Sequence, residues 1–167
     1  MPNRSTRILG IDPGSVITGY GIIESDGVHS VHIAHGALRV TGDDFPSRLG
    51  KIFNQLQSVV SEYQPVECAV ESVFMNKNAM SALKLGQARG AAIAAVVAAG
   101  IPVGEYSPRL IKQAVTGTGS AKKEQVQHMV GVLLNLRTDL QADAADGLAV
   151  ALCHAHARRS NFATVSS

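Results

Sequence analysis

The feature that most constrains the fold is a change of hydrophobic period near residue 45. Before it, three segments with β propensity, at 7–12, 20–24 and 31–40, are separated by the turn sequences PGS and SDG. From 45 to 64, apolar residues recur every three or four positions and share one face of a helix. We therefore expect an antiparallel meander of three strands, followed by a long amphipathic helix that Pro65 ends.

The rest of the chain alternates strand and helix patterns. We expect a strand at 66–71, an Ala- and Gly-rich helix at 78–99, a strand at 101–106, a helix capped by Ser120 that runs to about 136, and a helix at 140–158. Strands that alternate with helices extend a sheet in parallel βα units. The fold class predicted is α/β, with a mixed five-stranded sheet, three antiparallel strands and then βα units, flanked by helices.

Bulk composition indicates one globular domain. With 167 residues, 46% hydrophobic and 17% charged, the chain is long enough for one core. We expect that domain to span 1–158, with a short polar, disordered tail at 159–167. The longest uncharged apolar run, at 90–104, is shorter than the ~20 residues that span a bilayer, and 1–7 begin no secretory signal. We therefore expect a cytoplasmic protein with no membrane partner, and two buried free thiols, Cys68 and Cys153.

Four acids stand where three elements can bring them together. Asp12 ends the first predicted strand, Glu71 ends the fourth, and Asp143 and Asp146 lie three apart in the last helix. Strand ends are where α/β sheets assemble ligand sites. Carboxylates at that density repel one another unless a divalent cation binds them, and Mg²⁺ is the expected ion at a phosphate-processing site. Such a site suits the two-metal cleavage of a phosphodiester.

Each acid also has a simpler interpretation. Asp12 precedes Pro13 and Gly14, and it could merely begin a turn. Asp143 and Asp146 could be solvated or capping acids near a helix start. Net charge is only +2, from 15 Lys+Arg against 13 Asp+Glu. Setting the four acids aside leaves a basic excess, which is compatible with a nucleic-acid backbone as partner.

Four long motifs identify a resemblance: ILGIDPGSVITGYGII, VESVFMNKNAMSALKLGQARG, GSAKKEQVQHMV and QADAADGLAVALCHAH. In this order they resemble the RuvC family of Holliday-junction resolvases, over 7–156. The resemblance implies a ribonuclease-H-like fold and a homodimer that makes paired symmetric nicks in four-way junction DNA during recombination and repair. It also implies Mg²⁺ as cofactor, two ions per active site with Mn²⁺ able to substitute, and the RuvA–RuvB branch-migration complex as partner.

The resemblance also assigns roles to individual residues. It makes the four acids the metal ligands: Asp12, Glu71, Asp143 and Asp146. It places Lys112 and Lys123 near the scissile phosphate, where they can neutralise developing charge, and Phe74 against the bases at the junction centre. Phe74 could instead be a core residue, and either lysine an ordinary solvated one.

Three further basic residues have two possible roles. Lys77, Lys84 and Arg89 lie on or beside the second predicted helix, where they could contact DNA or order the dimer interface. The six histidines receive no role. Gly147 departs from the family pattern, in which alanine is common, and we expect it to cost the helix ~0.5–1 kcal/mol relative to alanine.

Two other function classes deserve comparison. The segment GIDPGSVITGYG also resembles the first phosphate-binding hairpin of an actin-like or sugar-kinase-like ATPase, although the chain lacks the second domain and phosphate loop of those enzymes. A junction-binding protein without catalysis, or a related nuclease that acts on RNA, is a further alternative. Intact acids at all four positions argue against a protein without catalysis.

Overall fold

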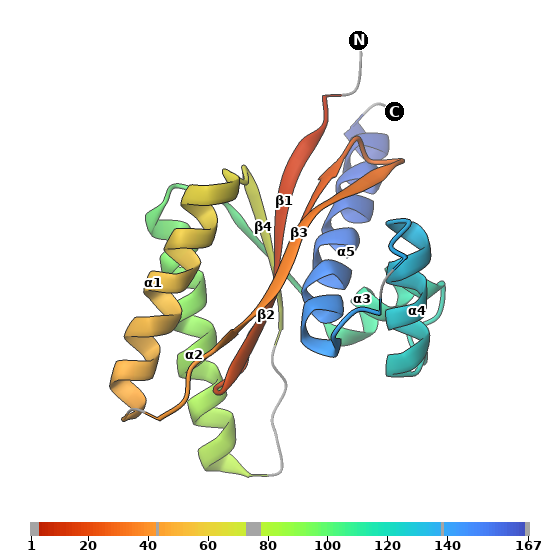
Figure 1. Cartoon of the computed structure of the whole chain (residues 1–167). Helices are drawn as coiled ribbons and strands as arrows, with labels where there is room; N and C mark the ends of the chain where they lie inside the picture. The colour runs from red at the N-terminus through yellow and green to blue at the C-terminus, as the bar shows by residue number, and fades with distance from the viewer. Residues whose placement is uncertain (1–3, 43, 73–77, 138, 166–167) are drawn as a thin grey trace.

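The computed structural model describes residues 4–42, 44–72, 78–137 and 139–165, the last six of these by their backbone only. The elements in chain order are β1 Thr6–Asp12, β2 Ile17–Ser25, β3 Ser30–Arg39, α1 Phe45–Tyr63, β4 Glu67–Glu71, α2 Ala79–Ala98, β5 Val103–Tyr106, α3 Pro108–Thr116, α4 Lys123–Leu133 and α5 Ala142–Val165. The start of β1 and the end of α5 lie at the same end of the molecule (Figure 1).

The five strands form one sheet in the order β3-β2-β1-β4-β5. β1 pairs with β2, and β2 with β3, in the antiparallel sense, whereas β4 is parallel to both β1 and β5. The predicted mixed sheet, three antiparallel strands followed by βα units, is therefore confirmed. Because β1 and β4 are parallel neighbours, Asp12 and Glu71 lie at the same end of the sheet.

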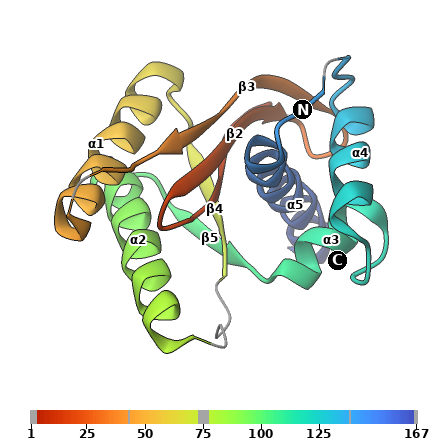
Figure 2. The ribbon, with the colours of Figure 1, turned by 60° about the horizontal axis from the view of Figure 1, so that its bottom comes forward.

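Helices cover both faces of the sheet. α1 and α2 lie on one side, and α5, with α3 and α4 outside it, lies on the other (Figures 1 and 2). On the α1 and α2 side, large side chains such as Leu9, Ile22, Ile52 and Leu56 form a buried core. On the α5 side the core includes Ile8, Ile23 and the alanine-rich middle of α5.

Local sequence signals account for the helix ends. Before α1, Asp44 accepts a hydrogen bond from the Ser47 backbone N–H at 3.0 Å, and after it Gln64 adopts the left-handed conformation with φ 53°. Asn78 caps α2 through the N–H groups of Met80 and Ser81. These signals explain why both long helices begin and end close to the predicted residues.

The helices after β5 differ from the prediction. α3 was missed, because a nine-residue helix that begins at Pro108 shows too few turns to reveal its period. α4 begins at Lys123 and not after Ser120, whose hydroxyl lies 3.0 Å from that of Thr118 instead. α5 continues past the expected end at 158 to Val165, since 159–165 contains neither glycine nor proline. Most of the expected tail is therefore helical in the structure.

Glycines let α5 approach the sheet closely. A Cβ on Gly19 of β2 would lie 1.9 Å from the Asp143 carbonyl oxygen, and one on Gly147 of α5 would lie 2.6 Å from the backbone of Tyr20. Such contacts leave no room for any side chain. The expected penalty of Gly147 relative to alanine considers the helix alone, whereas an alanine Cβ here would meet the backbone of β2.

Both cysteines are buried free thiols, as predicted. Cys68, on β4, lies in the core on the α1 and α2 face of the sheet, and Cys153, on α5, lies in the core on the opposite face. Burial raises the pKa of each thiol to about 12. In the part of the chain that the structure describes, no helix is long and apolar enough to cross a membrane.

Candidate active site

Two acids meet where β1 and β4 end. The last paired residues of these strands are Ile11 and Val70, and the next residue on each strand is an acid, Asp12 and Glu71. Their carboxyl groups contact each other through a hydrogen bond. The prediction that the two strand ends bring these acids together is confirmed.

A third acid reaches the pair from α5. The Asp146 carboxylate shares a hydrogen bond with Asp12, so Asp12 lies between Glu71 and Asp146. Asp143 lies one helical turn earlier, in the first turn of α5, with its carbonyl against Gly19. The structure thus links three of the four predicted acids through Asp12, and Asp143 lies on the same helix as Asp146.

The pKa values of two of these acids are raised by burial and by the neighbouring carboxylates. Burial, and then contact with Glu71, raises the pKa of Asp12 to about 8. Burial and the charge of Asp12 raise the pKa of Asp146 to about 6. The raised pKa of Asp12 favours a proton held between Asp12 and a neighbouring carboxylate near neutral pH, where it forms the hydrogen bond between them.

This proton bears on whether the acids can hold a metal. Among the described residues, no three Asp, Glu, His or Cys side chains already surround one point as ligands would. Three oxygen-donor side chains nevertheless meet at one strand end, and their mutual repulsion is what a hard divalent cation relieves. The donor set fits Mg²⁺ or Mn²⁺, with metal binding displacing the shared proton.

Two lysines join the acids in one cleft. The Lys123 ammonium lies 3.5 Å from the Asp146 carboxylate and forms an ion pair with it. Lys112, on α3, lines a cleft of about 320 Å³ together with Glu71, Lys123 and Asp146. Pro108, Ile111, Val126, Ala149 and Val150 complete the lining. Because α3 was not predicted, the sequence alone could not place Lys112 on a helix that faces the acids.

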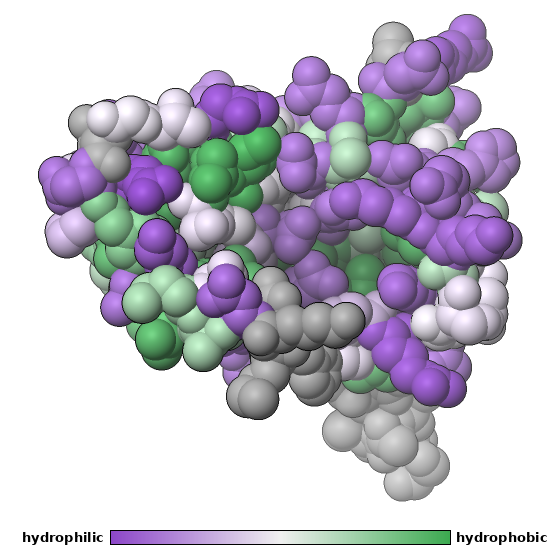
Figure 3. All heavy atoms as spheres, turned by 90° about the horizontal axis from the view of Figure 1, so that it is seen from below, coloured by the Kyte–Doolittle hydropathy of each residue, from purple (hydrophilic) through white to green (hydrophobic). Residues whose placement is uncertain are grey.

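The cleft opens at the end of the sheet where β1 and β4 finish. Figure 3 shows the molecule from this end, with hydrophilic side chains gathered around a hollow on the side of α3, α4 and α5. More hydrophobic surface appears on the side of α1 and α2. The polar surface is thus the one that bears the acids and both lysines.

The other predicted DNA contacts have different outcomes. Phe74 and Lys77 lie outside the described residues. Lys84 is exposed on α2, with its ammonium 5.7 Å from the centre of the Phe45 ring. Arg89 points inward: its Nε donates to the Glu71 carbonyl oxygen at 3.2 Å, and its side chain is only 19% exposed.

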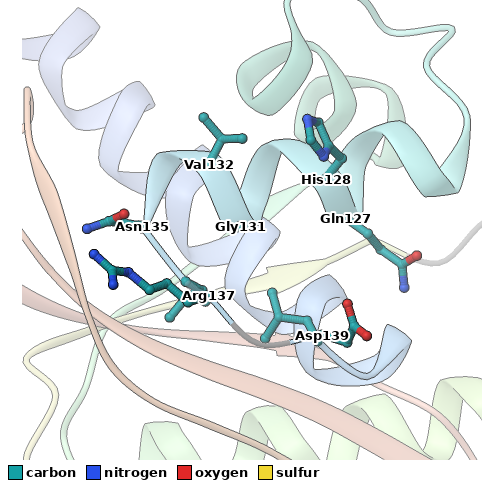
Figure 4. Close-up of a pocket in the computed structure, with 9 residues that line it drawn as sticks. Gln127, His128, Gly131, Val132, Asn135, Arg137 and Asp139 are labelled. Carbon is teal, nitrogen blue, oxygen red and sulfur yellow. The ribbon is translucent and has the colours of Figure 1, made fainter.

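A larger hollow of about 660 Å³ lies along α4 and the segment before α5 (Figure 4). Its lining is polar at several points, with Gln127, His128, Asn135, Arg137 and Asp139. None of the four predicted acids lines it. Size alone therefore does not mark the active site, which we assign to the smaller cleft that contains Glu71 and Asp146, because the pKa of Asp146 is raised.

Comparison with known proteins agrees with this geometry. The family model of the crossover junction endodeoxyribonuclease RuvC matches residues 8–154. This chain belongs to the RuvC family. RuvC of Shewanella amazonensis is 58% identical over 153 residues, which cover 92% of this chain and 88% of that protein, and RuvC of Shewanella oneidensis is 56% identical with the same coverage.

Solved structures extend the comparison to the fold. RuvC of Thermus thermophilus in complex with a Holliday junction substrate superposes with a TM-score of 0.88 at 33% identity, covering 93% of this chain and 96% of that one. The yeast mitochondrial Holliday junction resolvase, at 14% identity and a TM-score of 0.67, shares the fold, with coverage of 98% and 87%. The predicted ribonuclease-H-like resolvase fold is confirmed, and family membership removes the basis for the ATPase alternative.

Proposed function

We propose that this chain is a structure-selective endonuclease that resolves four-way DNA junctions by paired, symmetric nicks, in homologous recombination and DNA repair. The observation that carries the proposal is the contact among Asp12, Glu71 and Asp146 at the end of the RuvC-like sheet. A cluster of carboxylates that can bind metal ions, with two lysines beside it, is typical of a site that hydrolyses a phosphodiester.

The acids are proposed to hold the cofactor. Asp12, Glu71 and Asp146, with Asp143 one turn earlier on α5, would bind two Mg²⁺ ions, for which Mn²⁺ would substitute. Bound there, the ions supply an activated water and stabilise the leaving oxygen of the cut strand. Asp12 must lose its proton for this, because a ligand carboxylate has to be ionised.

The lysines are proposed to act on the phosphate. Lys112 and Lys123 line the same cleft as Glu71 and Asp146, so a phosphate seated over the acids lies within reach of two ammonium groups. Their positive charge would neutralise the negative charge that develops in the transition state. Phe74, Lys77 and Lys84 stay proposed DNA contacts, Phe74 by stacking on bases and the lysines through phosphates.

Paired nicks require two active sites, and we propose a homodimer. The outer surface of α2 supports this assembly. Met80, Leu83 and Val97 expose 61%, 62% and 55% of their surface there. Gly86 and Gly90 have open space where a Cβ would be, so a second helix can come close. The RuvA–RuvB complex as partner and the cytoplasm as location remain predictions from the family and the sequence.

The test is cleavage of a synthetic four-way junction labelled in turn on each strand, with and without Mg²⁺, analysed on a denaturing gel. We expect metal-dependent nicks at symmetric positions on two like strands, and none in linear duplex of the same sequence. Ligase should reseal the products if they carry 5′-phosphate and 3′-hydroxyl ends.

Two variants test the metal site. Asp12→Asn and Asp146→Asn should abolish cleavage, because each removes a charged metal ligand, yet bind the junction with about the wild-type affinity, since phosphate contacts dominate docking. A gel-shift titration beside the cleavage assay measures both. Wild-type cutting by either variant would refute the assignment, and binding without nicking by the wild type would indicate a junction-binding protein.

A further inference from the structure

Arg89 makes the one side-chain contact to the Glu71 backbone seen among the described residues. Its Nε donates to the Glu71 carbonyl oxygen at 3.2 Å, and its Nη2 pairs with the Glu105 carboxylate on β5. The Arg89 side chain is 19% exposed, whereas Glu105 is 55% exposed. The guanidinium is therefore held between two acceptors on neighbouring strands, with most of the side chain shielded from solvent.

The position of Glu71 explains why such a contact matters. Pairing between β1 and β4 ends one residue before Glu71, at Ile11 and Val70. On the other side, Glu71 pairs with Tyr106, and the Ser72 N–H donates to the Tyr106 carbonyl at 2.8 Å. The strand end that carries the proposed metal ligand is therefore tied to β5 on one side, and Arg89 supplies the hydrogen bond to its carbonyl.

The two acceptors of Arg89 belong to the two strands that must stay aligned at this point. Glu105 precedes Tyr106 on β5, and Glu71 ends β4. An arginine presents several donors in a fixed planar arrangement, so one guanidinium can bridge a carbonyl and a carboxylate and fix their separation. A residue that contacts a metal ligand without touching the metal itself can orient that ligand.

We infer that Arg89 is a positioning residue, which holds the end of β4 so that the Glu71 carboxylate faces Asp12 and the metal ions, and that it is not a DNA contact. The inference rests on the proposed function, because it assigns Glu71 to the metal site. It also connects α2, the helix with the proposed dimer surface, to a catalytic acid. Packing between two copies would then fix the position of Glu71 through Arg89.

The main experiment compares the wild type with Arg89→Met, which keeps the aliphatic length and removes every donor. Thermal unfolding across a Mg²⁺ series, without DNA, measures metal binding independently of activity. We expect the variant to need about tenfold more Mg²⁺ for the same rise in Tm, which is the size of effect typical when the partner of a metal ligand is lost. Half-maximal cleavage should shift to higher Mg²⁺ in parallel, with junction affinity in EDTA within about twofold of wild type.

Arg48→Met is the matched control. It makes the same chemical change on α1, where the guanidinium lies over the Phe45 ring, 5.2 Å from its centre. Its Mg²⁺ dependence should equal that of the wild type. Weaker junction binding by Arg89→Met with wild-type Mg²⁺ dependence would overturn the inference and make Arg89 a phosphate contact. Wild-type behaviour in both measurements would overturn it as well.

A second variant covers the case in which Arg89→Met does not fold. Glu105→Gln removes the negative charge of the ion pair but leaves the hydrogen bond from Arg89 to the Glu71 carbonyl. We expect this variant to need about two- to threefold more Mg²⁺ than the wild type for the same rise in Tm. An unchanged Mg²⁺ dependence in Glu105→Gln would then overturn the inference. Because unfolding is measured without DNA, a wild type that binds Mg²⁺ but cuts no junction would refute the proposed function and leave this inference standing.

Discussion

The two faces of the sheet are packed in different ways. On the α1 and α2 face, side chains such as Leu9, Ile22 and Leu56 fill the space between the helices and the strands. On the α5 face, three strand glycines meet the backbone of α5 directly. A Cβ added to Gly10 would lie 2.2 Å from the Gly147 carbonyl oxygen, and one added to Gly19 would lie 1.9 Å from the Asp143 carbonyl oxygen. A Cβ added to Gly21 would lie 2.6 Å from the Leu148 backbone. The α5 face, which has a side-chain core of its own, thus adds close backbone contacts at these glycines.

Because of this difference, we expect substitutions on the α1 and α2 face to change mainly stability, and those at the α5 contacts to change mainly catalysis. A layer of side chains can repack after a substitution, because rotamers and neighbours adjust. A backbone-to-backbone contact has no such freedom, so it fixes the height and rotation of α5 relative to β1 and β2. Since α5 carries Asp143 and Asp146, the glycine contacts determine where these acids stand relative to Asp12.

The largest expected effect comes from breaking this contact. Gly19→Ala places a Cβ on the Asp143 carbonyl and must push the first turn of α5 away from β2. A displacement of about 1 Å at reacting groups can cost about 100-fold in rate. We expect single-turnover cleavage of a four-way junction to fall by about that factor, measured at saturating Mg²⁺ and at a temperature where the variant is folded by circular dichroism.

Leu56→Ala on the opposite face serves as the contrast. Leu56 is fully buried, and we expect its truncation to cost about 2–5 kcal/mol of unfolding free energy. The folded fraction should still cut at about the wild-type rate, because no catalytic group moves. If the Leu56 variant lost cleavage while folded, or the Gly19 variant kept it, the two faces would not differ as described.

A smaller effect, on the free energy of unfolding, is expected from Gly147→Ala, and its sign distinguishes helix propensity from the close contact with β2. Helix propensity favours alanine by ~1 kcal/mol, whereas a Cβ here would lie 2.6 Å from the Tyr20 backbone and 2.8 Å from the Gly21 nitrogen. Overpacking typically costs about 1–3 kcal/mol, so the variant should be less stable in urea unfolding. Gly131→Ala, also in a helix but with open space around its Cβ position, should show the propensity gain alone. Stabilisation at both positions would contradict the close contact.

The last expected effect is a dependence of stability on pH. The pKa of Asp12 rises from 3.8 to about 8 on folding, so its protonated form contributes stability that is present below about pH 4 and lost as pH rises toward 8. In EDTA, Asp12→Asn should therefore gain in Tm over the wild type between pH 5 and pH 8. The gain should exceed the ~2–4 °C that is typical of ~1 kcal/mol in a domain of this size, because each pH unit over which only the folded state keeps the proton is worth about 1.4 kcal/mol. Excess Mg²⁺ should remove the advantage, because the wild-type carboxylate then binds the ion. If the variant and the wild type differed in Tm by the same amount at pH 5 and at pH 8, Asp12 would not be held protonated in the folded protein.

Sequence periodicity predicted most of this fold because each pattern was long or had clear ends. The first helix shows its face over five turns, and the four acids could be placed because a strand end and a three-residue helix spacing are local properties. The resemblance to the resolvase family supplied the roles of Lys112 and Lys123. α3 escaped because a helix of nine residues has too short a pattern.

Distances between elements were not available from the sequence. Gly147 looked like a weak point in a helix, because propensity describes the helix alone and not its separation from Tyr20. Arg89 looked equally suited to DNA or to a dimer interface, since nothing local shows that its guanidinium turns toward Glu71 and Glu105. Both outcomes depend on tertiary contacts between residues far apart in the chain.

The burial of Cys68 and Cys153 makes this chain convenient for site-specific labelling. With pKa values of about 12, both thiols stay protonated at neutral pH, and only 0% and 4% of their surface is exposed, so both react slowly with a maleimide. A cysteine introduced at an exposed position would therefore react alone, without prior removal of the native ones. Fluorophore pairs placed in this way on α2 and α4 could follow how the two helices move when a junction binds.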